Sequence, residues 1–153
     1  EQIGVLSIDG ENLTPELTPT IEKNMHLAIY KARKDIKAIV HAHPVTSSAF
    51  TVMQRNINTR LLAESRVVIG ELVKVKYATQ GTEELATNVA DTIKNAAVAL
   101  MENHGVIAVG KSMLQAFDRI EVLENAAKIT LITELLTDKK EISEEHIRLL
   151  DAL

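Results

Sequence analysis

Apolar residues recur at every third or fourth position in several segments of this chain, the spacing typical of amphipathic helices. The first predicted helix begins at Thr18-Pro19 or at Thr20 and ends at about Ala32. Threonine can accept the free amide protons of a helix start, and proline suits the first turn. The other predicted helices are Val45–Met53, Gly81-Thr82 to about Lys94, about Ser112 to Leu136, and a short final helix capped by Ser143. The apolar residues that indicate the longest helix are Phe117, Ile120, Leu123, Ala127 and Leu131.

Short runs of apolar and β-branched residues between these helices predict strands. Lys37–His43 is such a run, and Pro44 ends it because proline has no amide proton for a strand partner. The other predicted strands are 3–8, 66–69, 72–77, Ala96–Met101 and Val106–Val109. Strands that alternate with helices imply an α/β layered domain. The chain contains no internal repeat, low-complexity tract or linker, so residues 1–153 are expected to form a single domain.

The composition narrows the possible partners. Hydrophobic residues make up 46% of the chain and charged residues 25%, as in ordinary globular domains. The formal net charge is -4, and no basic stripe is present, which argues against nucleic-acid binding. No segment approaches the roughly 18 uncharged apolar residues that a membrane span needs. Neither nucleic acid nor a membrane is therefore expected as a partner.

The sequence contains no cysteine, which excludes disulfide bonds and cysteine-based zinc sites. Any tightly bound metal must therefore use histidine and carboxylate ligands. The absence of cysteine also fits a cytoplasmic protein.

Three histidines are the strongest candidates for chemistry. His41 and His43 are two residues apart in a predicted strand, so their side chains point to the same side of the sheet. His104 precedes Gly105, whose backbone freedom is expected to let a turn aim the imidazole inward. If the three rings meet, they form a three-histidine zinc site with an open position, as in catalytic zinc centres; copper, nickel and iron also suit imidazole. The alternative is that they are ordinary, partly buried or turn residues.

Other polar residues have weaker signals. Glu22 is predicted in the first turn of its helix, where a carboxylate gains from the helix dipole. His26, one turn later on the same face, could orient Glu22 or share a solvated face with it. Three residues are interpreted as turn and helix-cap residues in preference to pocket-edge groups: Tyr77, Thr79 and Thr82.

The order of several short segments along the chain resembles a known family. These segments are Pro19-Thr20-Ile21-Glu22 with His26, Ile29-Tyr30, Ala38–His43, Tyr77–Leu85, Glu102-Asn103-His104-Gly105 and Glu121–Glu124. Together they resemble the class II aldolase/adducin family over essentially the whole chain.

The resemblance implies an α/β fold with a central, mostly antiparallel β-sheet flanked by helices. It also implies a cytoplasmic homotetramer with four-fold symmetry and active sites at the subunit interfaces. His41, His43 and His104 would bind zinc (Zn2+), and Glu22 would be the catalytic acid/base. The implied enzyme is a class II aldolase, a carbon–carbon lyase of carbohydrate metabolism. It would cleave a ketose or ketose phosphate, such as fuculose-1-phosphate, by retro-aldol chemistry through a metal-stabilised enediolate.

The chain departs from the family pattern in its phosphate and proton-donor sites. It lacks the Gly-Asn-x-Ser segment and the Thr-Pro-x-Gly turn, so the domain is expected to be N-terminally truncated relative to the family. Thr20 and Ile21 occupy the places of paired serines, Leu62 that of a tyrosine, and no C-terminal tyrosine precedes Leu153. A sugar-phosphate epimerase or dehydratase, or a non-catalytic adducin-like interaction module, therefore stays open. The complete histidine set favours an enzyme.

Overall fold

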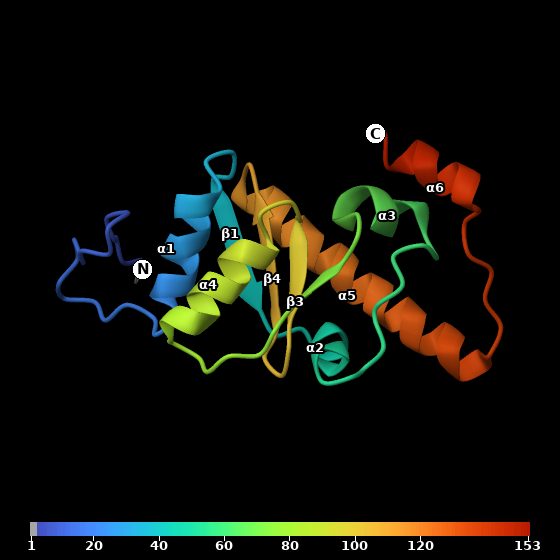
Figure 1. Ribbon diagram of the computed structural model, residues 1–153, viewed down its shortest axis with the longest axis horizontal. Coiled ribbons are helices and arrows are strands. Elements are labelled where there is room, and N and C mark those ends of the chain that lie inside the picture. Colours follow the sequence, from blue (N-terminus) through green and yellow to red (C-terminus); the bar gives the residue numbers. More distant parts are fainter. Residues whose placement is uncertain (1–2) are drawn as a thin grey trace.

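A four-stranded sheet lies between two layers of helices in the computed structural model, which describes residues 3–153 (Figure 1). The strands are β1 (Ala38–Ala42), β2 (Val73–Val75), β3 (Val98–Met101) and β4 (Val106–Gly110). Their order in the sheet is β1-β4-β3-β2. β4 pairs antiparallel with both β1 and β3, and only β2 and β3 are parallel. The predicted α/β class and the mostly antiparallel sheet are confirmed.

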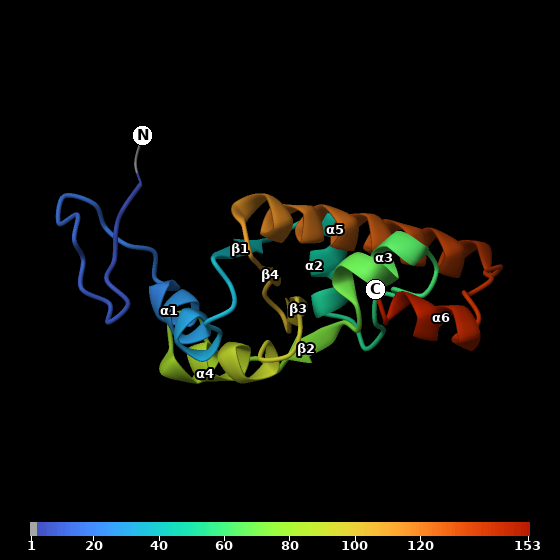
Figure 2. The ribbon, with the colours of Figure 1, turned by 90° about the horizontal axis from the view of Figure 1, so that it is seen from above.

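Helices cover both faces of this sheet. The helices of the structure are α1 (Lys23–Ala32), α2 (Val45–Thr51), α3 (Ala63–Ile69), α4 (Glu83–Thr92), α5 (Met113–Leu136) and α6 (Glu144–Leu150), of which α6 packs against α3. Figure 2 shows α1 and α4 on one side of the sheet and the long helix α5 on the other. Among the described residues, no helix has the length and apolar character needed to cross a membrane.

The side chains of β3 pack into the hydrophobic cores on both faces of the sheet. Ala99 and Met101 belong to the core formed with α1 and α4, whereas Val98 and Leu100 belong to the core formed with α2, α3 and α5. All four are at most 1% exposed. Neighbouring residues of a strand point to opposite faces of the sheet. A strand that is buried on both faces therefore has an uninterrupted apolar sequence.

Two predicted strands are wrong. Residues 66–69 lie in helix α3, where Ser65 and Ile69, four positions apart, bury one helical face. This helix ends at Gly70, whose φ of 74° is a conformation that glycine adopts easily. Residues 3–8 form no strand, and their β pairing is limited to an isolated bridge between Leu6 and Asn12.

The predicted start of the first helix is also wrong. Helix α1 begins at Lys23, with Glu22 at the N-cap position and no side-chain hydrogen bond capping it. Thr20 instead accepts a hydrogen bond from the backbone amide of Glu22 at 3.3 Å. Three other predicted helix starts are confirmed as side-chain N-caps: Thr82, Ser112 and Ser143.

On α5, the apolar residues that indicated the helix are not all buried. Ile120, Leu123 and Ala127 lie in the core. Phe117 and Leu131 are 51% and 41% exposed.

Candidate metal centre

The pairing of β1 with β4 brings together histidines that are about sixty residues apart in sequence. In the antiparallel register, His41 lies opposite Ile107 and Ala42 opposite Val106. The last residues of β1 and the first residues of β4 therefore lie at the same end of the sheet. His43 follows β1 directly and His104 precedes β4 by two residues, so this pairing places the two imidazoles side by side.

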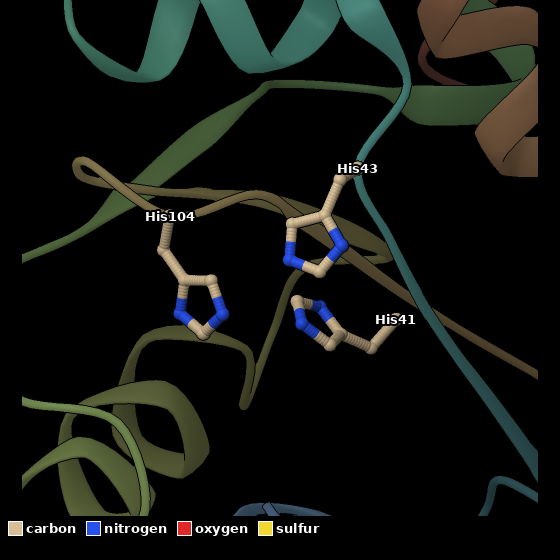
Figure 3. A group of neighbouring side chains, drawn as sticks. All are labelled: His41, His43 and His104. Carbon is tan, nitrogen blue, oxygen red and sulfur yellow. The ribbon is translucent and has the colours of Figure 1, made fainter.

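The three rings point toward a common space (Figure 3). One candidate ligand nitrogen from each of His41, His43 and His104 lies within 4.8 Å of the others. The ring centroids are 4.7 Å apart for His41 and His43, 4.9 Å for His41 and His104, and 5.4 Å for His43 and His104. The side chains of His41 and His104 are 7% and 5% exposed, whereas His43 is exposed. The cluster is thus closed on one side and open to solvent on the other.

The tautomer of His41 follows from its hydrogen bond. Its Nδ1 lies 2.8 Å from the carbonyl oxygen of Val106, which can only accept, so Nδ1 carries the proton. Nε2 is then left with a lone pair, and it has no hydrogen-bond partner. A backbone carbonyl that holds the far nitrogen of an imidazole is the usual way to orient a metal-binding histidine.

Glu22 completes the cluster. Its Oε2 lies 3.2 Å from Nε2 of His41, and its Oε1 lies 3.0 Å from Nε2 of His104. The Glu22 side chain is 14% exposed, and its buried Oε1 has no hydrogen-bond partner. This carboxylate therefore faces the imidazoles instead of capping α1, which corrects the predicted place in the first helical turn.

Burial favours the uncharged forms of His41 and His104. Burial lowers the pKa of His41 below its usual value, and this outweighs the carbonyl of Val106 and the carboxylate of Glu22, which raise it. Burial also lowers the pKa of His104, and the neighbouring His41 lowers it further. Uncharged imidazole is the form that binds a metal ion.

This donor set fits a cation. In the neutral tautomer of His41, a lone pair on Nε2 faces a carboxylate oxygen of Glu22 with no proton between them. Two electron-rich atoms at this distance repel each other unless a positive charge lies close by. Three imidazoles and a carboxylate suit zinc and other transition metals.

Gly105 makes the close packing of this cluster possible, for a reason other than the one predicted. The left-handed residue of the turn is Asn103, with φ 52°, and Gly105 is not among the positive-φ residues. A Cβ on Gly105 would lie 2.5 Å from Cδ2 of His43 and 2.8 Å from the carbonyl oxygen of Ala42. Glycine is needed here for space and not for an unusual backbone angle.

Other sequence candidates lie around this cluster. His26 is partly buried on α1, and burial followed by the charge of His41 lowers its pKa. Among the described residues, no hydrogen bond joins the His26 ring to Glu22, so an orienting role is not supported. Thr82 caps α4 by accepting the amide of Leu85, as predicted, and Tyr77 is 54% exposed.

Two residues of the family motifs have contacts that the sequence did not predict. The side-chain nitrogen of Gln80 lies 2.8 Å from Nε2 of His104. Gln80 lies inside the motif Tyr77–Leu85, but the motif alone assigns this residue no role. The second is Glu124 on α5, which binds the start of α2. Only the fold reveals that contact, because 77 or 78 positions separate the partners.

Known proteins are similar to this chain in both sequence and fold. Residues 1–131 match a family described as the class II aldolase and adducin N-terminal domain. An L-fuculose phosphate aldolase of Methanocaldococcus jannaschii is 34% identical over 136 residues, covering 89% of this chain and 72% of the relative. A 5-deoxy-D-ribulose 1-phosphate aldolase of Bacillus thuringiensis is 30% identical over 150 residues, covering 96% and 68%.

A solved structure gives the same picture. The crystal structure of YgbL from Escherichia coli, described as a putative aldolase/epimerase/decarboxylase, has a TM-score of 0.88 with 26% sequence identity. The similarity covers 96% of this chain and 72% of YgbL. These matches confirm the family resemblance that the sequence motifs suggested.

Proposed function

The chain belongs to the class II aldolase and adducin family, and we propose that it is a zinc-dependent aldolase acting on a ketose or ketose phosphate such as fuculose-1-phosphate. The predicted enzyme class, a class II aldolase and carbon–carbon lyase, is confirmed by the family and by relatives named aldolases. The observation that carries the finer proposal is the meeting of three imidazoles and one carboxylate at a partly open site.

His41, His43 and His104 are the proposed metal ligands. The support is their convergence, the free Nε2 of His41 and the lowered pKa values of His41 and His104. Zinc held there would supply a Lewis acid for the negative charge that develops on the substrate's oxygens during carbon–carbon cleavage. The exposure of His43 leaves one side of the cluster accessible to a substrate.

Glu22 is the proposed acid/base. Its carboxylate is close to two of the three imidazoles and is mostly buried, and its Oε1 has no protein hydrogen-bond partner. A general base has to lie within hydrogen-bond reach of the proton that it moves. We propose that Glu22 moves the proton on the carbon next to the substrate's carbonyl group.

The two named relatives support a phosphorylated substrate. One is named for L-fuculose phosphate and the other for 5-deoxy-D-ribulose 1-phosphate. We therefore propose that the substrate is a ketose phosphate and not an unphosphorylated ketose.

An epimerase is the second candidate, favoured by the name of YgbL, which includes aldolase, epimerase and decarboxylase. An epimerase that breaks and remakes a carbon–carbon bond would need the same charge stabilisation beside a ketose carbonyl. It would return an isomer of the substrate instead of releasing two fragments.

A cytoplasmic homotetramer is part of the same proposal. Large apolar side chains are exposed together in the last two turns of α5: Leu131, Ile132, Leu135 and Leu136 are 41%, 53%, 75% and 69% exposed. Clustered exposed apolar residues are typical of surfaces that bind other protein chains. The cytoplasmic location rests on the family resemblance and on the cysteine-free sequence.

The test combines metal analysis with a retro-aldol assay on several ketose phosphates. We expect the wild-type protein to bind one zinc per chain and to release two fragments from a substrate. His41→Ala should lose both zinc and turnover, and Glu22→Gln should keep zinc and lose turnover. His146→Ala is the matched control, because His146 lies on α6 and contacts Ser143.

The outcomes separate the candidates. Isomerisation without fragment release, at one zinc per chain, would favour the epimerase. Full activity of thoroughly metal-free protein would contradict the proposed chemistry. An intact fold that binds no metal would favour an interaction module.

A further inference from the structure

Helix α2 connects the two segments that carry His43 and His104. It begins at Val45, two residues after His43. At its other end, the carbonyl of Thr51 accepts a hydrogen bond of 3.2 Å from the backbone amide of Asn103, the residue before His104. A movement of α2 would therefore reach both histidines.

The start of α2 has no cap of its own. Pro44 occupies the N-cap position and makes no side-chain hydrogen bond to the helix. The first amides of a helix need acceptors, and a negative charge near them is favourable. In this protein the acceptor comes from another element, α5.

Glu124 of α5 is that acceptor. Its Oε1 accepts the backbone amide of Thr46 at 3.1 Å, and its Oε2 accepts the amide of Ser47 at 2.8 Å and the Ser47 hydroxyl at 2.7 Å. Ser47 is completely buried, and the Glu124 side chain is 13% exposed. Three hydrogen bonds to one mostly buried carboxylate hold this helix end in a single position.

The charge of Glu124 is consistent with this geometry. Burial alone would raise its pKa, but the hydrogen bonds from Ser47 and Thr46 outweigh burial and lower the pKa to about 2. The nearest cationic group is Lys128, whose Nζ lies 3.6 Å from Oε1 and which is itself 58% exposed. The Glu124 carboxylate is thus held mainly by the hydrogen bonds from Thr46 and Ser47 at the start of α2.

The other end of α2 is held as firmly. Lys74 of β2 donates hydrogen bonds from Nζ to the carbonyls of Phe50, Met53 and Arg55, at 3.3, 2.8 and 3.3 Å. With both ends held, the seven residues of α2 act as a spacer of roughly 10 Å, at about 1.5 Å per residue. This spacer links the chain after His43 to the turn that carries His104.

We propose that Glu124 is a positioning residue of the metal centre, which fixes α2 and, through it, the relative placement of His43 and His104. This inference rests on the proposed function for the metal itself. It assigns Glu124 no contact with metal or substrate. Its role is to keep two ligand-bearing segments at a set separation, and such supporting contacts commonly affect metal affinity about 10- to 100-fold.

The test uses Glu124→Gln in the full chain. Glutamine has nearly the same size, but it loses the charge and turns one of the two accepting oxygens into a donor that faces the N–H groups of α2. We expect zinc affinity, measured by competition with a chromophoric chelator, to fall about 10- to 100-fold. The visible spectrum of the cobalt-substituted protein should also change, since it reports ligand geometry.

Ser112→Ala is the matched control. It removes the side-chain cap of α5, so it also costs a helix cap, but it lies twelve residues before Glu124 on that helix, and within residues 3–153 the Ser112 side chain bonds only the Gln115 amide and nothing in α2. Its zinc affinity and cobalt spectrum should stay as in wild type. Equal losses of affinity in the two variants, or an unchanged affinity in Glu124→Gln, would overturn the proposal.

A metal-free readout separates this inference from the proposed function. In protein without metal, Glu124→Gln should shift the NMR ring signals of His43 and His104 and speed hydrogen exchange at the Asn103 amide, and leave His146 unchanged. If wild-type protein binds no zinc but these shifts occur, the positioning role stands and the proposed function fails. If the ring signals and the exchange rate do not change, the positioning role is overturned, whatever the metal content.

Discussion

Replacing Gly105 by alanine would place a methyl group inside the histidine cluster. The added Cβ would lie 2.5 Å from Cδ2 and 3.0 Å from Nε2 of His43, and 2.8 Å from the carbonyl oxygen of Ala42. Carbon atoms in ordinary contact are about 3.5–4.0 Å apart, so the imidazole has to retreat by roughly 1 Å. The carbonyl of Ala42 cannot retreat in the same way, because β1 pairs with β4 at this residue.

The size of the effect can be estimated for both stability and metal binding. Inserting a methyl group into a well-packed region typically costs about 1–3 kcal/mol in the free energy of unfolding. Metal–ligand distances tolerate changes of only about 0.2 Å, so a shift of roughly 1 Å removes His43 from the coordination sphere. We expect Gly105→Ala to lose at least the roughly 100-fold in zinc affinity that marks the upper range for changing a supporting group.

The assay is chelator competition for zinc, combined with urea unfolding of the metal-free protein. Gly70→Ala is the control, because Gly70 has φ 74° and a Cβ there would meet no atom within 4 Å. In that variant, backbone strain should lower the free energy of unfolding by about 1–3 kcal/mol, and the zinc affinity should stay unchanged. Wild-type zinc affinity in Gly105→Ala would refute the reasoning, since it would mean that His43 either moves freely or is not a ligand.

Three further predictions concern the stability of the fold. Lys74→Met removes three hydrogen bonds to carbonyls in the last turn of α2 and just after it. Urea unfolding should show a loss of about 1–3 kcal/mol, and a loss under about 0.5 kcal/mol would contradict this. Thr82→Ala removes the cap of α4 and should cost about 1 kcal/mol in the same assay, whereas Thr87→Ala, at an exposed position inside α4, should not destabilise. The pKa of Glu124 is lowered from 4.5 to about 2 in the folded protein. The ionised carboxylate therefore adds to the free energy of unfolding above pH 4.5, and this stabilisation is lost as the pH falls through about 2. This contribution is at most about 3 kcal/mol, so wild type and Glu124→Gln should converge in stability toward pH 2, and a constant difference from pH 7 to pH 2 would argue against it.

Much of the fold was predictable because local signals agree with the tertiary structure. The helix starts at Thr82, Ser112 and Ser143 follow from side chains that accept amide protons. The strand directions were not predictable from pattern, since apolar runs do not reveal which strands pair. Residues 66–69 show the limit of a short sequence window. Three β-branched residues in a row, 67–69, fit a strand and a helix equally well, and tertiary packing decides between them.

The candidate site was predictable in its residues but not in its supporting contacts. His41, His43, His104 and Glu22 were chosen from spacing and family motifs, and the fold places them together. Their roles as ligands and acid/base stay predictions. The contact of Glu124 with α2 depends on how two helices pack, which no local pattern contains.

The close approach of Gly105 to His43 is also a tertiary feature. The sequence indicated that a glycine mattered next to His104. It could not indicate that the reason was a neighbouring imidazole, because that ring arrives from another strand.

The most direct test of the metal centre is a crystal structure of zinc-loaded protein with diffraction data collected at the zinc absorption edge. We predict one anomalous peak per chain, about 2.0–2.1 Å from a ring nitrogen of each of His41, His43 and His104, with the Glu22 carboxylate beside it. A zinc peak elsewhere, or none at these histidines under saturating zinc, would contradict the account.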